Sequence, residues 1–166
     1  PVVYNATHIG SGAAGAAGNA TGWLLRAGTK GLVANSIVTE MKNKAIEVQD
    51  RPSNTTTDAY SQLVAGELVI KNNLFWNCGS NTAIDMTSSG IIRSTVTTGL
   101  GGEDSLCTFL INHLNTNSNL IQNPQITNVS RLQNGLLDPR PSATGAAYST
   151  SLAANPSGDV FFSNVS

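Results

Sequence analysis

Three charged residues occupy the same position in a repeated pattern, and they are the strongest candidates for chemistry. Arg26, Glu47 and Asp85 each follow an aliphatic residue in the similar runs WLLRAG, AIEVQD and AIDMTS. If these runs form neighbouring strands, the alternation of side chains places all three on one sheet face. The two carboxylates would then lie about 5 Å apart, as in retaining glycosidases, and Arg26 could hold the carboxyl group of a uronate. The alternative is a solvent-exposed row of charges, which contributes little to stability.

The histidines and cysteines predict structural roles. His8 aligns with apolar residues, and His113 lies on the apolar side of a helical pattern, so both are interpreted as packing residues. Because neither has a carboxylate at ligand spacing, we expect no metal site and no cofactor. Cys78 and Cys107 are the only cysteines. They allow one disulfide, and two separate buried thiols are the alternative.

An internal repeat predicts the elements that position these residues. VYNATHIG (3–10), VANSIVTE (33–40) and IKNNLFWN (70–77) each carry an asparagine at the same point of an apolar run. Stacked strands lie about 4.8 Å apart, so equivalent buried amides could hydrogen-bond to one another. The pattern therefore predicts a structural ladder of inward-facing asparagines, whose members are Asn5, Asn35 and Asn72.

A second aligned series fixes the predicted architecture. Its alignment places Leu25, Ile46 and Ile84 in one column, with a period of about 21 or 22 residues once the loops at 11–22 and 51–66 are removed. Such a repeat of short strands with loops at the corners is typical of a parallel solenoid. We therefore predict an all-β fold, a right-handed parallel β-helix of about three coils.

The remainder of the chain is expected to complete one domain. Residues 1–101 would form the coils, and the spacing of apolar residues predicts an amphipathic helix at 102–115. Because a solenoid exposes a hydrophobic end, we interpret this helix as a cap. Residues 116–166 would supply a final strand and an extended tail. The first coil, which starts at Pro1, has no visible cap, so we expect it either to continue into preceding sequence or to stack on another copy.

Composition excludes several classes of partner. Only 11% of the 166 residues are charged, the formal net charge is -1, and no basic cluster is present, so nucleic acid is an unfavourable partner. No run approaches the roughly 18 apolar residues of a membrane span. The sequence starts without an initiator methionine or a signal-peptide pattern, which we interpret as processing or excision from a longer chain.

The order of these motifs resembles the C-terminal part of secreted bacterial right-handed parallel β-helix proteins, a group of large surface or exported proteins. The resemblance runs through the repeats and is most specific in LLDPRPSATGAA (136–147) and DVFFSNVS (159–166). It implies the β-helix fold and a location outside the cell, either secreted or at the cell surface. It implies no catalytic residues.

We therefore expect a non-catalytic structural or adhesive surface module whose partners are cell-surface or matrix glycans. Two alternatives stay open. One is a carbohydrate-active protein, either a polysaccharide lyase or a glycoside hydrolase, that binds or cleaves a polyanionic polysaccharide at Arg26, Glu47 and Asp85. The other is the subunit of a fibre stacked end to end through the uncapped coil.

Overall fold

The computed structural model describes residues 1–15, 21–50, 58–78, 92–96, 103–149 and 151–154. For residues 92–96, 103–107 and 149 only the backbone is described. Ile84, Asp85 and the motif at 159–166 therefore lie outside the described residues.

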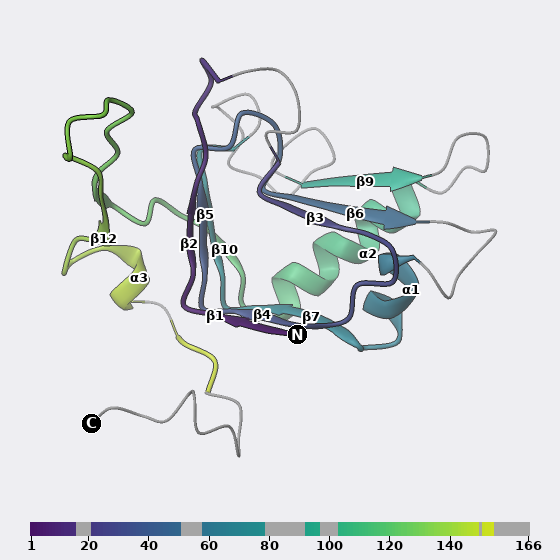
Figure 1. Ribbon diagram of the computed structural model, residues 1–166. Helices are drawn as coiled ribbons and strands as arrows, with labels where there is room; N and C mark the ends of the chain where they lie inside the picture. Colours follow the sequence, from purple (N-terminus) through teal and green to yellow (C-terminus); the bar gives the residue numbers. More distant parts are fainter. Residues whose placement is uncertain (16–20, 51–57, 79–91, 97–102, 150, 155–166) are drawn as a thin grey trace.

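Three small parallel sheets surround the core (Figure 1). The first sheet has the strand order β1 (Val2–Tyr4), β4 (Gly31–Ala34) and β7 (Leu68–Lys71). The second has the order β10 (Leu120–Ile121), β8 (Leu74–Trp76), β5 (Ile37–Thr39) and β2 (Thr7–Ile9). The third has the order β3 (Trp23–Leu25), β6 (Ile46–Asp50) and β9 (Ile92–Val96).

The alignment of the asparagine-containing runs is confirmed by the strand pairing. Val33 lies opposite both Val3 and Ile70 in the first sheet, and Val38 lies opposite both His8 and Phe75 in the second. The β-branched and aromatic residues of these runs favour strands. The short spacing between β1 and β2, between β4 and β5, and between β7 and β8 turns the chain from one sheet to the other at a single corner.

The alignment of the second series was wrong by two residues. Ile46 lies opposite Trp23, and Leu25 lies opposite Val48. On its other side Ile46 pairs with Ile92, eight positions beyond the predicted Ile84. The apolar residues of β3 and β6 alternate, so a shift of two residues keeps the same side chains inward and leaves the apolar pattern unchanged.

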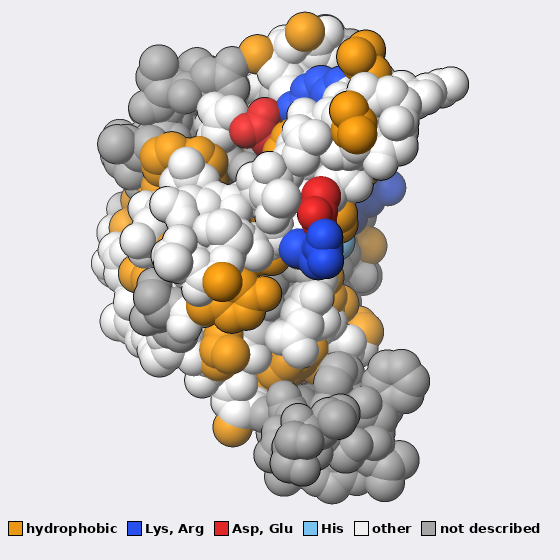
Figure 2. Space-filling model, turned by 90° about the vertical axis from the view of Figure 1, so that its left-hand side faces the viewer, with side chains coloured by type: hydrophobic (Ala, Val, Ile, Leu, Met, Phe, Trp, Pro, Cys, Tyr) orange, Lys and Arg blue, Asp and Glu red, His pale blue; other side chains and the backbone are white. Residues whose placement is uncertain are grey.

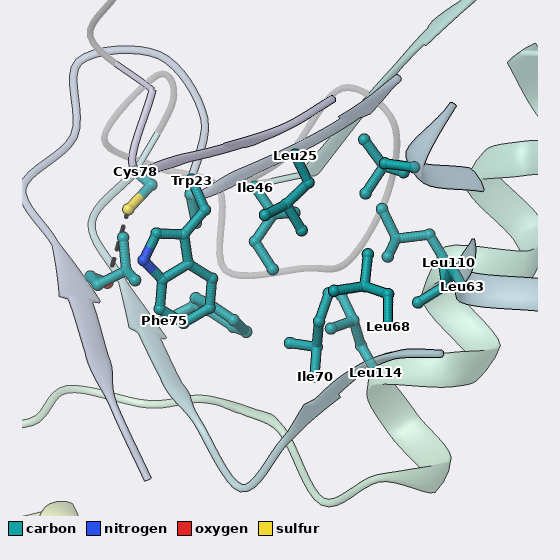
Figure 3. Packing of buried hydrophobic residues seen from close by; sticks show 14 of the residues in the cluster. Trp23, Leu25, Ile46, Leu63, Leu68, Ile70, Phe75, Cys78, Leu110 and Leu114 are labelled. Carbon is teal, nitrogen blue, oxygen red and sulfur yellow. Dashed lines mark hydrogen bonds between the residues drawn. The ribbon is translucent and has the colours of Figure 1, made fainter. Parts of the chain in front are cut away.

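The core fills the space between the three sheets and one long helix, α2 (Glu103–Thr116) (Figure 3). Phe75 and Ile46 are fully buried beside Trp23, whose ring meets Phe75 edge to face at 5.7 Å between centroids. From α2, Leu110 and Leu114 complete the core. Each such side chain contributes roughly 1.5–3 kcal/mol through burial.

The prediction of an all-β parallel β-helix with one capping helix was wrong. Over the described residues the structure is a mixture of four small sheets, three parallel and one antiparallel, with three helices. Its described residues do not form a closed solenoid. The predicted loop at 51–66 contains α1 (Ala59–Val64), and the predicted extended tail contains the antiparallel pair β11 (Ile126–Asn128) and β12 (Asp138–Pro141) and the short helix α3 (Ala146–Ser149).

Local interactions explain these departures. Asp58 begins α1 by accepting a hydrogen bond from the Ser61 N–H, which satisfies a free donor of the first turn, and Leu63 of α1 is buried in the core. In the C-terminal region Ala146 of α3 packs on the outer face of the second sheet against Ile37 and Leu74. The tail is therefore folded because that outer face is apolar.

The helix expected at 102–115 is α2, which runs from Glu103 to Thr116. It lies along one end of the core, next to β7 and β9 (Figure 1). His113 Nε2 accepts a hydrogen bond of 3.1 Å from the Ile70 N–H. The backbone of β7 that faces away from β4 is thus bonded to α2 and its following turn.

Candidate functional site

The predicted column of charges is not assembled as expected. Arg26 is exposed after the end of β3, while Glu47 lies opposite Leu24 and Arg93. Because Arg26 does not face Glu47, the pair that would bind a uronate is not formed there. Asp85 lies outside the described residues.

The two histidines have packing roles in the structure. His8 lies edge-on to Trp23, with 5.8 Å between ring centroids, and its Nε2 is a buried atom without a hydrogen bond. Burial lowers the pKa of both His8 and His113. Within the described residues no group of three or more histidine, cysteine, aspartate or glutamate side chains could hold a metal ion.

Cys78 is a free, buried thiol (Figure 3). Its sulfur donates to the Trp76 carbonyl at 3.2 Å, and burial raises its pKa to about 11. A thiol of this kind is protonated at neutral pH and reacts slowly. The side chain of Cys107, with which Cys78 was expected to pair if a disulfide formed, lies outside the described residues.

Asn5, Asn35 and Asn72 form a row at the corner between the first and second sheets, which we call the asparagine corner. All three have left-handed backbones, with φ values of 55°, 52° and 54°. Asparagine tolerates this conformation better than other non-glycine residues. Asparagine therefore recurs at this turn because it adopts the left-handed backbone conformation that the turn requires. The side chains of these asparagines point outward.

The inward-facing polar ladder lies one residue further along the chain, at Ser36, Asn73 and Asn119, which we call the buried amide ladder. Asn73 Oδ1 accepts from the Ser36 N–H at 2.9 Å, and Asn119 Oδ1 accepts from Asn73 Nδ2 at 2.9 Å. Asn119 Nδ2 donates to the carbonyls of Ile70 and Leu114 at 2.8 and 2.9 Å. The observed polar ladder therefore consists of these residues and not of the predicted Asn5, Asn35 and Asn72.

The outward amides of the asparagine corner bind the C-terminal segment 151–154. The Ala153 N–H donates to Asn35 Oδ1 at 2.8 Å, and Asn35 Nδ2 donates back to the Ala153 carbonyl at 3.1 Å. Asn72 Nδ2 donates to the Ser151 carbonyl at 3.0 Å. Asn35 and Asn72 thus bind an extended backbone through main-chain atoms alone.

A second corner, after β2, β5 and β8, also binds the C-terminal region. Glu40 and Asn77 have left-handed backbones there, and Asn77 Nδ2 donates to Glu40 Oε1 at 2.6 Å. Arg131 donates to Glu40 Oε2 at 2.8 Å and to the Gly10 carbonyl at 3.0 Å. Figure 2 shows the side of the molecule that carries β12 and α3, where most side chains are uncharged and acidic groups lie next to basic ones.

The two ends of the sheets differ in how they are covered. Along the inward column of the first sheet, Ile70 in β7 is fully buried, whereas Val3 in β1 is 37% exposed. No described strand pairs with the free side of β1, β2 or β3, which together we call the open edge. Leu24 of β3 adds an exposed apolar side chain to this edge.

Backbone direction at the open edge follows from the hydrogen bonds already made. The Leu32 N–H bonds the Pro1 carbonyl, the Ile37 N–H bonds the Ala6 carbonyl, and the Trp23 N–H bonds the Ala45 carbonyl. In a parallel ladder alternate residues bond to each neighbour. The N–H and C=O groups of Val2, Thr7, Ile9 and Leu24 therefore point away from the sheets.

The sequence contained no signal for the binding of the tail. The contacts of residues 151–154 join parts of the chain about 80 to 120 positions apart and leave no periodic trace. No helix within the described ranges is long and apolar enough to cross a bilayer. Comparison of the chain with models of protein families, with curated proteins and with solved structures finds no match in any of the three.

Proposed function

We propose that this chain is a non-catalytic structural or adhesive module that acts outside the cell and joins another polypeptide by strand addition at the open edge. The observation that carries the proposal is the contrast between the end of the three sheets that α2 contacts and the open edge, with which no described strand pairs. The extracellular location rests on the resemblance of the sequence motifs, above all LLDPRPSATGAA (136–147).

An open edge favours association for two reasons. Edge strands present unpaired N–H and C=O groups, which are a template for another strand. Here the outward groups of Val2, Thr7 and Leu24 lie beside exposed apolar side chains, so pairing would also bury Val3 and Leu24. Lysine and proline within a strand are two of the features that keep an edge strand single, and the three-residue strands β1, β2 and β3 contain neither residue.

The covered end limits the geometry of assembly. A fibre needs two free ends in each subunit, but α2 lies against β7 and β9, so at that end the two-residue strand β10 is the described edge that α2 does not cover. Two copies would instead meet open edge to open edge around a twofold axis, which gives a closed pair. The carbohydrate-active alternative has no comparable support, because Arg26 does not lie opposite Glu47.

A lysine placed at the open edge tests the proposal. Leu24→Lys puts a charge beside the outward backbone of β3, and Leu132→Lys is the matched control, because Leu132 is 74% exposed and belongs to no strand. Light scattering coupled to size exclusion would follow self-association over a range of concentrations. We expect Leu24→Lys to weaken the dimer at least tenfold and Leu132→Lys to leave it unchanged.

Two results would contradict the proposal. One is a wild-type chain that stays monomeric up to millimolar concentration. The other is equal weakening by both lysine substitutions, which would show that general surface hydrophobicity, and not the edge, drives association.

A further inference from the structure

The asparagine corner forms hydrogen bonds with the main-chain atoms of a neighbouring segment. Asn35 makes a two-bond contact with the N–H and C=O of Ala153, and Asn72 bonds the carbonyl of Ser151. The partners are two residues apart, while the asparagines are one strand layer apart. Alternate residues of an extended segment thus meet successive layers of the corner.

We propose that the asparagine corner is a binding site for an extended polypeptide backbone, and that residues 151–154 occupy it as an internal ligand which a separate extended peptide of small residues can replace. This site is distinct from the open edge, because it uses side-chain amides at a turn and not the backbone of an edge strand.

The contacts define the class of ligand. Ala153 is half-buried against the corner, so a small side chain is required at that position, whereas Leu152 is 62% exposed and its side chain is free to vary. The Tyr4 hydroxyl donates to the Ala154 carbonyl at 2.9 Å and extends the track beyond Asn35. No carboxylate or amine is needed in the ligand, since the contacts are to backbone N–H and C=O groups.

The asparagine corner has one more asparagine than the described segment 151–154 uses. Asn5 has the same left-handed backbone as its two counterparts, is exposed, and makes no side-chain hydrogen bond to a described residue. A longer extended segment would therefore find a third amide in line with Asn35 and Asn72. The additional amide of Asn5 would allow the corner to bind a longer peptide than residues 151–154.

The experiment uses the full chain with its internal ligand weakened. Ala153→Pro removes the N–H that donates to Asn35 Oδ1. The probe is a synthetic peptide of residues 149–155, STSLAAN, and the control peptide STSLPAN lacks the same N–H. Binding is followed through the side-chain amide signals of the asparagines in two-dimensional nitrogen–proton NMR spectra.

We expect Ala153→Pro to shift the Asn35 signal, and STSLAAN to reverse the shift saturably at millimolar concentration while STSLPAN does not. The unmodified chain should need at least about fivefold more peptide, because a tethered segment competes at an effective concentration of order millimolar. Asn72→Gly in the Ala153→Pro background should weaken the response of the Asn35 signal to STSLAAN, because it removes the bond to the Ser151 carbonyl, and glycine preserves the left-handed backbone at position 72.

Three results would overturn the inference. The first is an Asn35 signal in Ala153→Pro that does not change with STSLAAN. The second is an equal response to both peptides, which would mean that the N–H is not read. The third is an unchanged response of the Asn35 signal in the Asn72→Gly variant. Because these measurements are read at Asn35, which lies between β4 and β5 and not at the open edge, the inference can fail while the proposed function stands, and the reverse also holds.

Discussion

The buried amide ladder predicts a large loss of stability when its last member is removed. Asn119 is almost fully buried and makes four side-chain hydrogen bonds of 3.2 Å or less, two through Nδ2 and two through Oδ1. Its partners belong to β7, to the end of α2 and to the turn that holds Asn73. Substitution of Asn119 by alanine therefore breaks the connection between the helix and two sheets.

The magnitude follows from those four bonds. Each contributes about 1 kcal/mol net, and the buried groups left without partners add to this cost. We expect Asn119→Ala to lower the free energy of unfolding by about 3–5 kcal/mol, a large part of the 5–15 kcal/mol that is usual for a domain. The midpoint of a urea titration should fall, with little change in the slope.

A matched control separates the ladder from a general effect of losing an asparagine. Asn112 lies on the exposed side of α2 and makes no side-chain hydrogen bond, so Asn112→Ala should change stability by no more than about 0.5 kcal/mol. A loss below about 1 kcal/mol for Asn119→Ala would refute the reasoning, because it would mean that the four bonds are exchanged for water at little cost.

Three further predictions concern backbone strain, pH and thiol reactivity. Gly31→Ala should lower the free energy of unfolding by more than about 2 kcal/mol in a urea titration, because its φ is 123° and an added Cβ would lie 2.0 Å from the Pro1 carbonyl oxygen. Gly66→Ala is the control: at φ 75° with open space around it, it should lower the free energy by about 1 kcal/mol. Equal losses for the two variants would contradict this prediction. Because burial lowers the pKa of His113 in the folded state, the stability of the chain should fall as the pH drops through the unfolded value of about 6.5. His113→Gln, which keeps an acceptor for the Ile70 N–H, should reduce that fall in thermal melts from pH 7.5 to 5, with the remainder due to His8; an unchanged pH dependence would count against it. In a Cys107→Ser background, Cys78 should resist iodoacetamide at pH 8 and react fully in urea, since its pKa is about 11 and it is buried; rapid alkylation of the native chain would show that the thiol is accessible.

The sequence predicted the pairing within two sheets but not the architecture around them. The runs that contain Asn5, Asn35 and Asn72 fix their register because asparagine marks the turn and apolar residues follow at constant spacing. The third sheet lacks such a marker, and an even shift of Leu25 against Ile46 leaves the inward residues apolar. That degeneracy explains both the misplaced column and the failure of Arg26 and Glu47 to meet.

The remaining errors concern interactions that do not repeat. The α1 helix follows from the Asp58 cap, a local signal that was masked by its Pro/Asn/Thr-rich surroundings. The hairpin of β11 and β12 and the packing of Ala146 on Ile37 depend on contacts between distant segments. For the candidate site, the corner asparagines were found, but their outward orientation depends on a left-handed φ that a residue alignment does not report.

The placement of α2 at a single end of the sheets also determines where thermal fluctuations will begin. Strand β7 is held by β4 on one side and by α2 with its following turn on the other, while β4 is the only described strand beside β1, to which the Tyr4 hydroxyl adds a bond to the Ala154 carbonyl. Local opening should therefore require least free energy at β1 and most at β7. Amide hydrogens should exchange with solvent in that order, so the molecule would loosen layer by layer from Val3 toward Ile70.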